Sequence, residues 1–295
     1  NLLRQGELGM LAHHHNPLAI AGLTGQSLVM VGDPLAPSQT TALALQTLSR
    51  AAAHTYSRPV IYKCCARVAL AARKAGWCVA IVAKEAWVDP KTYSTAGTAG
   101  RQIRRMLRKA EAGDVTVTQA GKNLPFDQMD VIARDWARKQ GGERGFSMGR
   151  YDRDYICHQR VFLAWQKNRL IAFVTLSEVE GEWALDLMRK RETAPAGTMH
   201  LLVSHAILAA ERADCPRVSL AAVPDFATTN RRTIRRLRQM LDQRAGTGGL
   251  TRFKSCFAPH WEQLYAAAPT RLALGVGLWD VTRAIHRPKR RNYKR

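Results

Sequence analysis

The sequence lacks any apolar stretch long enough to cross a membrane. A transmembrane helix needs about 18 or more consecutive, mostly uncharged apolar residues, and no such run occurs among the 295 residues. Neither the charged n-region nor the apolar h-region of a signal peptide is visible at the start. Because 46% of the residues are nevertheless apolar, we expect a soluble segment with one large domain or two ordinary ones. The chain begins at Asn1 rather than at a methionine, so we expect it to be cut from a longer protein.

Cysteine is also scarce, and its spacing excludes the common metal sites. The six cysteines contain no CxxC pair, and no Cys/His spacing matches a zinc site. The consecutive His13, His14 and His15 cannot all face one ion on a regular element. We therefore predict neither a metal nor a cofactor. The adjacent Cys64 and Cys65 end an apolar run, which is typical of buried free thiols and favours a reducing, cytosolic compartment.

Acidic residues are few, and this imbalance is the strongest compositional signal. Against 23 Asp and Glu residues stand 45 Lys and Arg residues, which gives a net charge of +22. A field of this size attracts polyanions. Nucleic acid and an anionic membrane surface both fit, and charge alone does not choose between them. A small acidic metabolite needs far less positive charge.

Residues 1–26 are weakly patterned, but strands and helices alternate clearly after them. We predict strands at residues 27–31, 59–65 and 78–88, and helices at residues 38–54 and 68–76. Ser38 can cap the first of these helices, and Gly76 closes the second. This β-α-β-α-β succession predicts an α/β layer structure.

A basic amphipathic helix is predicted at residues 97–113. Its cations recur at helical spacing and are Arg101, Arg104, Arg105, Arg108 and Lys109. Apolar residues cover the other side. Surface helices often carry arginine for solubility, but five cations with only Glu111 nearby exceed that pattern. We predict that this helix contacts a polyanion and that its apolar side is buried between two α/β units.

The second α/β unit follows from residue 114. We predict a strand at 115–119, a helix at 126–139, a charged loop at 143–155 and antiparallel strands at 160–166, 169–179 and 182–189. After them we predict a helix at 198–213, a strand at 216–224, a basic helix at 229–244, two strand-like pieces within 250–268 and a terminal helix. The tail at 286–295 has six cations and no acid, so we expect it to order only on a phosphate-rich partner.

The stretch at residues 183–203 joins a strand, a polar turn and a helix. Apolar residues alternate along its first part, so that Asp186 faces the other way near the end of the strand. Arg189 and Arg191 follow, and the helix begins after a breaker that contains proline and glycine. Backbone N–H groups at such a helix start point toward an anion. An anion site and an ordinary solvated loop explain this stretch equally well.

Several motifs of the chain resemble one known family. The segment LDLMR followed by GTM, at residues 185–199, is similar to a motif of the cytosolic catalytic domains of bacterial aminoacyl-phosphatidylglycerol synthases, also called multiple peptide resistance factors. Further motifs agree in order: VGDPLAP, PVIYK, RQIRRMLRKAE, ERGFSMGRYD and GLTRFKSCFAPHWEQLY. The resemblance runs from about Gly32 to Tyr265. The combination of GFSMGR, LDLMR and GLTRFK is specific.

The resemblance implies two acetyltransferase-like (GNAT) folds in tandem, an α/β (α+β) architecture bridged by the basic helix. We accordingly predict an N-terminal domain at residues 1–96, the bridging helix at 97–113 and a catalytic domain with a basic tail at 114–295. The resemblance also implies transfer of an amino acid, lysyl or alanyl, from charged tRNA as co-substrate to a hydroxyl of phosphatidylglycerol. The implied partners are aminoacyl-tRNA, anionic phospholipid and a separate membrane domain, at the cytoplasmic face of the bacterial inner membrane.

The resemblance carries three catalytic residues over to this chain. Asp186 would hold the aminoacyl ammonium or aid the hydroxyl, and Arg189 would clamp a phosphate. Lys254, at the rim of the same cavity, would bind the tRNA 3′ end. The structural alternatives are an Asp186–Arg189 pair and a solvated Lys254. The further predicted substrate-binding residues are Arg150, Tyr151, Arg191, Gly197 and His200, and those predicted for tRNA or lipid phosphates are Arg101, Arg104, Arg105 and Arg108.

Two departures from the family pattern leave the amino acid and the acceptor open. His200 stands where family members carry an acid, and residues 242–248 replace an acidic, aromatic stretch. A lysyl donor would want more acids than this chain offers. A small neutral aminoacyl group fits no worse.

Two other functions compete with this one. An acyl-CoA N-acetyltransferase would need glycines in the loop at residues 191–196, where this chain has Ala194 and Pro195 instead. A non-catalytic tRNA- or membrane-binding module becomes the better explanation if Asp186 and Arg189 form a buried pair with no cavity beside them.

Overall fold

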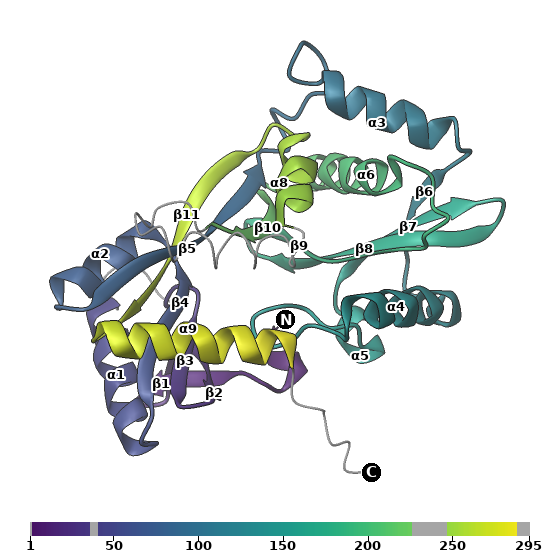
Figure 1. Cartoon of the computed structure of the whole chain (residues 1–295). Coiled ribbons are helices and arrows are strands. Elements are labelled where there is room, and N and C mark those ends of the chain that lie inside the picture. Colours follow the sequence, from purple (N-terminus) through teal and green to yellow (C-terminus); the bar gives the residue numbers. More distant parts are fainter. Residues whose placement is uncertain (1, 36–40, 226–246, 288–295) are drawn as a thin grey trace.

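The structure is a computed structural model that describes residues 2–35, 41–225 and 247–287. It confirms the predicted α/β class, because the strands of one sheet alternate along the chain with helices that cover both faces (Figure 1). No helix in these ranges combines the length and the apolar character that crossing a membrane requires. The predicted cap Ser38, the predicted basic helix at 229–244 and most of the cationic tail lie outside the described residues.

The helices and strands come in the following order. The first part of the chain contains η1 (Leu2–Gln5), β1 (Gly9–His13), β2 (Asn16–Thr24), β3 (Ser27–Val31), α1 (Thr41–His54), β4 (Arg58–Cys64), α2 (Ala66–Lys74) and β5 (Cys78–Val88). Next come α3 (Arg101–Glu111), β6 (Thr116–Gln119), α4 (Phe126–Gln140), α5 (Arg153–Ile156), β7 (Arg160–Gln166), β8 (Arg169–Val179) and β9 (Glu182–Lys190). The last are α6 (Thr198–Arg212), β10 (Val218–Pro224), α8 (Thr247–Ser255), β11 (His260–Ala268) and α9 (Arg271–His286).

The described strands form one continuous sheet with an internal repeat. The sheet has eleven strands in the order β1-β2-β3-β4-β11-β5-β10-β9-β8-β7-β6. In the first repeat, an antiparallel meander of β1, β2 and β3 is followed by α1 and the parallel strand β4. In the second repeat, a meander of β7, β8 and β9 is followed by α6 and the parallel strand β10. The two α/β units of the sequence therefore share one sheet.

The repeats exchange strands at the centre of the sheet. β11, from the end of the chain, lies between β4 and β5, and β5 lies between β11 and β10. β5 and β11 run antiparallel, from His260 opposite Trp87 to Ala268 opposite Cys78. The division into two domains at residues 97–113 stays a prediction. β11 and α9 follow this division in sequence, but they pack with strands of the first repeat.

Helices cover both faces of each repeat. Over the second repeat, α6 packs on one face and α4 on the other, and over the first repeat, α1 and α2 oppose α9 in the same way. In Figure 1, α3, α6 and α8 lie on one side of the second repeat, whereas α4, α5 and α9 lie on the opposite side. This arrangement decides which helices can reach each side chain of the site.

The basic helix α3 packs on α6 and not between the two repeats, so its predicted position is corrected. Ile103 and Ala110 on its inner side are buried in the core that α6 covers. Gly197, just before α6, has a φ of 95°, and a Cβ at this position would lie 1.9 Å from the carbonyl oxygen of Met106 in α3. Only glycine allows the two backbones to come so close. This contact fixes α3 over the N-terminal end of α6.

The local structure differs from the sequence pattern at two places, for physical reasons. Residues 9–24, whose sequence is weakly patterned, form the hairpin of β1 and β2. Consecutive residues of β2 such as Leu18 and Ala19 are buried, so the strand is covered on both faces and shows no alternation. Residues 250–255, predicted to be strand-like, belong to α8, where Phe253 contacts His200 of α6, and Phe257, just after the helix, contacts the same side chain.

Candidate functional site

A β-bulge in β9 brings Asp186 and Arg189 to the same face of the sheet. On a regular strand, residues three apart point to opposite faces. Here Asp186 and Leu187 together stand opposite Thr175 of β8. The buried hydroxyl of Thr175 accepts a hydrogen bond from the N–H of Leu187 at 3.1 Å and so supports the bulge. Asp186 and Arg189 therefore both reach the side of the sheet that α4 and α5 cover.

Asp186 is held through one of its two carboxylate oxygens. The hydroxyl of Tyr155 in α5 and the Nε2 group of Gln159 both donate to Oδ2, each at 2.6 Å. Burial, and then the charge of Asp186, raise the pKa of Tyr155, so the phenol keeps the proton that it donates. Oδ1 faces Gly149, where a Cβ would lie 2.0 Å away. Among the described residues, no group donates a hydrogen bond to Oδ1, so its hydrogen-bonding capacity is not used within the described ranges.

The loop between α4 and α5, which contains the ERGFSMGRYD motif, is anchored by both ends of the chain. Gln5 of η1 accepts a hydrogen bond from the N–H of Arg150 at 3.1 Å and donates to the carbonyl of Met148 at 3.2 Å. The N–H of Gly145 donates to the carbonyl of Ile285 in α9 at 3.2 Å. The loop that lies against Asp186 is therefore positioned by the first repeat and by α9.

Arg189 is buried and already paired. Its side chain is 5% exposed, and its Nη2 group donates to Glu143 at 2.9 Å. The guanidinium lies over the ring of Trp136, 3.5 Å from the centroid. Burial lowers the pKa of Arg189, and the charges of Glu143 and Asp186 oppose that shift. The structural alternative of an Asp186–Arg189 pair is thus not found, and a phosphate would reach the Nη2 group only by displacing Glu143.

The strands β9 and β10 separate beside Asp186. These parallel strands pair at Trp183 with Val218 and at Ala184 with Ser219, and at no later position of the described strands. In the first repeat, the equivalent strands β3 and β4 stay paired along the whole of β3. The carboxyl end of β9, which carries Asp186 and Arg189, therefore lies at an opening of the sheet, where ligands of open α/β sheets commonly bind.

Lys254 reaches β10 from α8, which lies on the α6 side of the sheet. Its side chain is 2% exposed, and its Nζ group donates to the carbonyls of Ala221 at 2.8 Å and Ala222 at 3.3 Å. Ala221 has a φ of 64° and belongs to a second bulge, in β10. Lys254 is therefore neither solvated nor at a rim, in contrast to both predictions. Within the described ranges, no contact joins it to Asp186 or Arg189.

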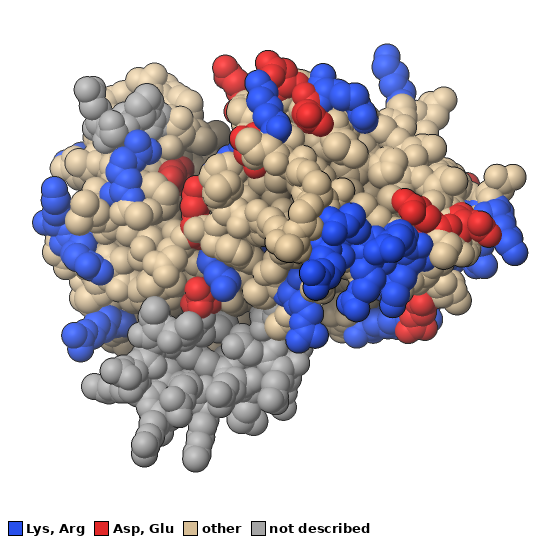
Figure 2. All heavy atoms as spheres, turned by 90° about the horizontal axis from the view of Figure 1, so that it is seen from above, with Lys and Arg blue, Asp and Glu red and all other residues tan. Residues whose placement is uncertain are grey.

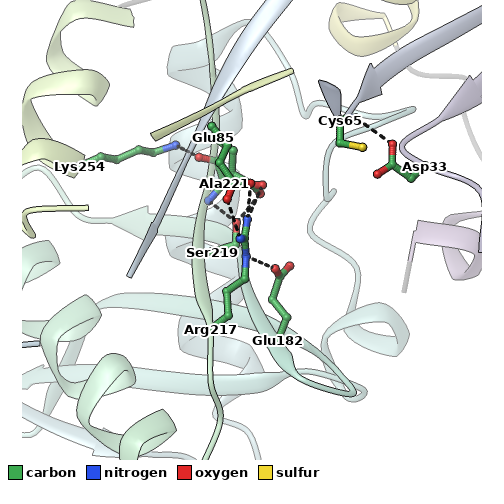
Figure 3. Close-up of polar contacts among 9 residues, drawn as sticks. Asp33, Cys65, Glu85, Glu182, Arg217, Ser219, Ala221 and Lys254 are labelled. Carbon is green, nitrogen blue, oxygen red and sulfur yellow. Dashed lines mark hydrogen bonds and ion pairs between the residues drawn. The ribbon is translucent and has the colours of Figure 1, made fainter. Parts of the chain in front are cut away.

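A polar network surrounds Lys254 at the centre of the sheet (Figure 3). Ser219 donates to Glu85 at 2.6 Å, and Figure 3 shows Lys254 pointing to the backbone at Ala221 beside this pair. Arg217 forms ion pairs with three carboxylates, those of Glu85 at 3.1 Å, Glu182 at 2.6 Å and Glu262 at 3.2 Å. Because these side chains come from β5, β9, β10 and β11, the network joins the two repeats.

Lys254 should make stability depend on pH just above neutrality. Burial, and then the charge of Lys63, lower the pKa of Lys254 from its ordinary 10.5 to about 7, with Glu85 opposing. Between these two values the unfolded chain binds the proton that the folded chain has lost, so the free energy of unfolding must rise with pH. Relative to Lys254→Met, we expect a gain of about 1 kcal/mol between pH 7 and pH 8 in chemical unfolding. Parallel pH profiles of the two proteins would contradict this pKa.

Two predicted substrate-binding residues belong to the loop that contacts Asp186 through Gly149. Tyr151 donates through its hydroxyl to Asp130 at 2.6 Å, and its ring lies 5.9 Å from that of Phe173. Arg150 follows Gly149, whose Cα faces the Asp186 carboxylate. Arg150 and Tyr151 thus follow the residue that contacts Asp186, and their contact with substrate stays a prediction.

The other three predicted substrate-binding residues have structural partners. Arg191 donates through Nε to the carbonyl of Leu170 at 2.8 Å, and Gly197 lies against α3. The ring of His200 lies 4.6 Å from that of Phe253 in α8 and 5.9 Å from that of Phe257, just after α8. Burial, and then Lys190, lower the pKa of His200 to about 4, so its imidazole is neutral at pH 7. The anion site predicted at the start of α6 is therefore covered by α3.

The predicted phosphate-binding arginines do not all point to solvent. Arg101, Arg105 and Arg108 are exposed on the outer side of α3. Arg104 instead donates to the carbonyls of Thr95 and Gly97 in the preceding loop. Figure 2 views the molecule from the side that carries α3 in Figure 1 and shows a dense group of Lys and Arg side chains there. The cationic surface is thus real, and its ligand stays a prediction.

Sequence reasoning missed the residues that hold the catalytic candidates. Tyr155 and Gln159 orient Asp186, Glu143 pairs with Arg189, and Gln5 anchors the loop. The one available signal was the density of polar residues in the loop motif, which did not say which of them face β9. In the described ranges, no three His, Cys, Asp or Glu side chains come together as metal ligands would.

Comparison with protein families gives a match over most of the chain. The model of the family "Phosphatidylglycerol lysyltransferase, C-terminal" matches residues 3–268. The chain belongs to this family. It is 26% identical over 300 residues to the phosphatidylglycerol lysyltransferase of Bacillus subtilis (strain 168). This alignment covers 93% of the chain but 34% of that protein. It is 31% identical over 162 residues to the lysylphosphatidylglycerol biosynthesis bifunctional protein LysX of Mycolicibacterium vanbaalenii, which covers 52% of the chain and 14% of that protein.

Several solved structures share the fold over nearly the whole chain. L-PGS from Bacillus licheniformis superposes with a TM-score of 0.82 at 23% identity, over 97% of this chain and 91% of that one. The DUF2156 C-terminal domain from Agrobacterium fabrum gives a TM-score of 0.85 at 23% identity, over 98% and 92%. FemX gives 0.60 at 7% identity, over 90% and 89%. At these identities the likeness concerns the fold alone.

Proposed function

We propose that this chain transfers an amino acid from aminoacyl-tRNA to a headgroup hydroxyl of phosphatidylglycerol, at the cytoplasmic face of the bacterial inner membrane. The observation that carries the proposal is the Asp186 carboxylate, which two donors fix through Oδ2 on β9, beyond the last pair of residues that joins β9 to β10. The relatives' names, phosphatidylglycerol lysyltransferase and lysylphosphatidylglycerol biosynthesis protein, support the lipid acceptor. The chain spans about a third of the B. subtilis relative.

Asp186 suits two tasks in this reaction. The lipid oxygen forms an ester bond to the aminoacyl carbonyl, and the ester bond to the terminal ribose of the tRNA breaks. The proton of the lipid hydroxyl must leave, and the ribose oxygen must gain one. Oδ1 can accept a hydrogen bond from that hydroxyl or hold the α-ammonium of the aminoacyl group. Tyr155 and Gln159 keep the carboxylate in one orientation, which lowers the cost of reaching the reactive geometry.

The carboxylates near Asp186 offer little to a lysyl side chain. Glu143 is paired with Arg189, and Asp130 is paired with Arg153 at 2.6 Å. Their charges are thus already balanced by arginines. We therefore extend the proposal to alanyl as well as lysyl donors.

The packing of α3 argues against an acyl-CoA donor. That class would place a pyrophosphate at the glycine-rich start of the helix that follows the strand. Here α3 lies against Gly197 at this point, and a Cβ on Gly113 would contact Pro195 at 2.7 Å. The turn before α6 thus lacks the glycine-rich loop that would bind a pyrophosphate, and α3 already packs against it.

Mass spectrometry of lipids tests the proposal directly. The protein is incubated with total charged tRNA and phosphatidylglycerol vesicles, and new aminoacyl lipids are identified by their mass. We expect a product that disappears when the tRNA is deacylated beforehand. A full set of charged tRNAs that yields no aminolipid would refute the proposal. A product made from acetyl-CoA without tRNA would support the acyl-CoA alternative instead.

The exposed arginines of α3 should set the salt dependence of tRNA binding. Each phosphate that a cation neutralises adds about 0.7 to 0.9 to the slope of log affinity against log salt. We therefore expect the double substitution Arg105→Ser/Arg108→Ser to flatten this slope by about one to two units in filter binding. The matched control is Arg67→Ser/Arg73→Ser, which removes the same charge from exposed positions of α2. Equal slopes for the two double variants would mean that α3 is only a solvated face.

A further inference from the structure

Helix α9 presents an apolar stripe to solvent although its inner side belongs to the core. Leu272 and Trp279 are 70% and 68% exposed. They are seven residues apart and therefore lie on the same side of the helix. On the opposite side, Ala273, Leu274 and Val281 are buried against the first repeat. α9 is thus apolar on the side that is packed and again on the side that is not.

The packing of α9 fixes this orientation. Asp280 accepts hydrogen bonds from the N–H of Gln26 at 2.9 Å and from the hydroxyl of Ser27 at 2.8 Å. A Cβ on Gly277 would lie 2.4 Å from a methyl carbon of Val60, so the helix backbone sits directly on β4. The helix cannot turn its tryptophan inward without breaking both contacts. The exposure of Trp279 is therefore determined by the packing of α9.

The outer side of α9 is also cationic. Its exposed charged residues are Arg271, Arg283 and, just after the helix, Arg287. Asp280 is the only acid of this helix, and it is buried. The sequence that continues at 288–295 adds five Lys and Arg residues and no acid. A partner of α9 must therefore accept an apolar stripe flanked by positive charge.

We propose that the outer side of α9 docks on an anionic lipid surface, with Trp279 and Leu272 in the headgroup region and the flanking cations at the lipid phosphates. An exposed tryptophan and leucine flanked by arginines are typical of helices that lie in the membrane interface. Nucleic acid would need the cations but not the apolar pair, which α3 lacks on its exposed side. This inference rests on the proposed function and assigns its two polyanions to different surfaces, lipid to α9 and tRNA to α3.

The positions of the two surfaces fit this assignment. α3 and α9 lie on opposite sides of the sheet (Figure 1). Asp186 points to the α4 and α5 side, which is also the side of α9, and α9 holds the loop at Gly145. A membrane on α9 would thus face the side from which Asp186 is reached, while the surface of α3 stays free for tRNA.

Vesicle co-sedimentation tests the proposal with matched variants. The probe is a series of phosphatidylcholine vesicles with increasing phosphatidylglycerol content. We expect Leu272→Ala/Trp279→Ala to weaken binding about tenfold or more. The control Tyr56→Ala/Leu70→Ala removes two side chains that are 99% and 54% exposed near α1 and on α2, and it should bind as the wild type does. All four side chains are exposed, so thermal melting should confirm that each variant is folded.

A second measurement places Trp279 itself at the lipid. Brominated phosphatidylglycerol quenches tryptophans that enter the interface. Trp279→Phe should keep most of the vesicle affinity and lose the quenching seen in the wild type. Quenching that persists in Trp279→Phe would overturn the proposal, because another tryptophan would then be the one at the lipid.

Other outcomes separate this inference from the proposed function. Wild-type affinity of Leu272→Ala/Trp279→Ala for vesicles would overturn it, and so would loss of vesicle binding in Arg105→Ser/Arg108→Ser instead. A dimer in sedimentation equilibrium that becomes monomeric in the α9 variant, with unchanged vesicle binding, would assign the stripe to a second copy. Vesicle binding through α9 without any aminolipid product would refute the proposed function and leave the docking surface standing.

Discussion

Asp186→Asn is expected to lower aminoacyl transfer by about a hundredfold or more, the usual scale for a positioned acid or base, and to leave the melting temperature nearly unchanged. Both donors of the site, Tyr155 and Gln159, converge on Oδ2 at 2.6 Å. The asparagine carbonyl can take this place, so the hydrogen bonds survive. Its amide group then replaces Oδ1 beside Gly149, and the charge that would bind the ammonium or the hydroxyl is lost.

The control for Asp186→Asn is a substitution of a residue that donates a hydrogen bond to Asp186. Tyr155→Phe removes one donor but keeps the carboxylate charge, so it should reduce turnover less than Asp186→Asn does. Single-turnover transfer from charged tRNA and thermal melting are measured for the same preparations. Normal transfer by a folded Asp186→Asn protein would end the catalytic assignment, whatever the role of its neighbours.

The sequence predicts the elements of this fold better than their arrangement. Strong local signals predict the basic helix at 97–113, the meander from 160 to 189 and the helix after Gly197. The structure contains each of these elements, with the basic helix at Arg101–Glu111. Local periodicity depends on neighbours in the chain, so these elements can be predicted without knowledge of the sheet. The hairpin at residues 9–24 cannot be predicted in this way. Its second strand, β2, is covered on both faces, so buried and exposed residues do not alternate along it.

The arrangement depends on contacts between distant residues, which a single sequence does not reveal. The exchange of β5 and β11 joins residues 78–88 to residues 260–268. The position of α3 depends on one close approach, between Gly197 and the backbone of Met106.

The candidate site shows the same limit. Asp186 and Arg189 were predicted to act together, but regular strand geometry puts them on opposite faces. The bulge opposite Thr175 brings both side chains to one face, and the local pattern of β9 does not predict this bulge. The partners of both residues come from α4, α5, the loop between them and the residues just after α5, more than twenty residues earlier in the chain. Sequence motifs could therefore name the catalytic candidates but not the residues that hold them.

Glu143→Gln is expected to destabilise the folded protein by about 3 kcal/mol, because it leaves a buried guanidinium without its counter-charge. Arg189 is 5% exposed, and Glu143 accepts from its Nη2 group at 2.9 Å. The ring of Trp136 beneath the guanidinium offers only its weak negative face. Glutamine has nearly the same shape and can still accept a hydrogen bond, so the loss reports the charge and not the packing. Urea unfolding of the two proteins at pH 7 measures the difference.

Two further variants decide whether this loss belongs to the buried pair. Asp214→Asn removes the acid of the Lys91–Asp214 pair, whose side chains are 60% and 83% exposed, and it should cost less than about 1 kcal/mol. The double variant Glu143→Gln/Arg189→Met removes both buried charges and should be more stable than Glu143→Gln alone, since no unpaired charge remains inside. If Glu143→Gln costs no more than Asp214→Asn, the guanidinium of Arg189 does not depend on Glu143. Arg189 would then be free to bind a phosphate, as the sequence motif predicts.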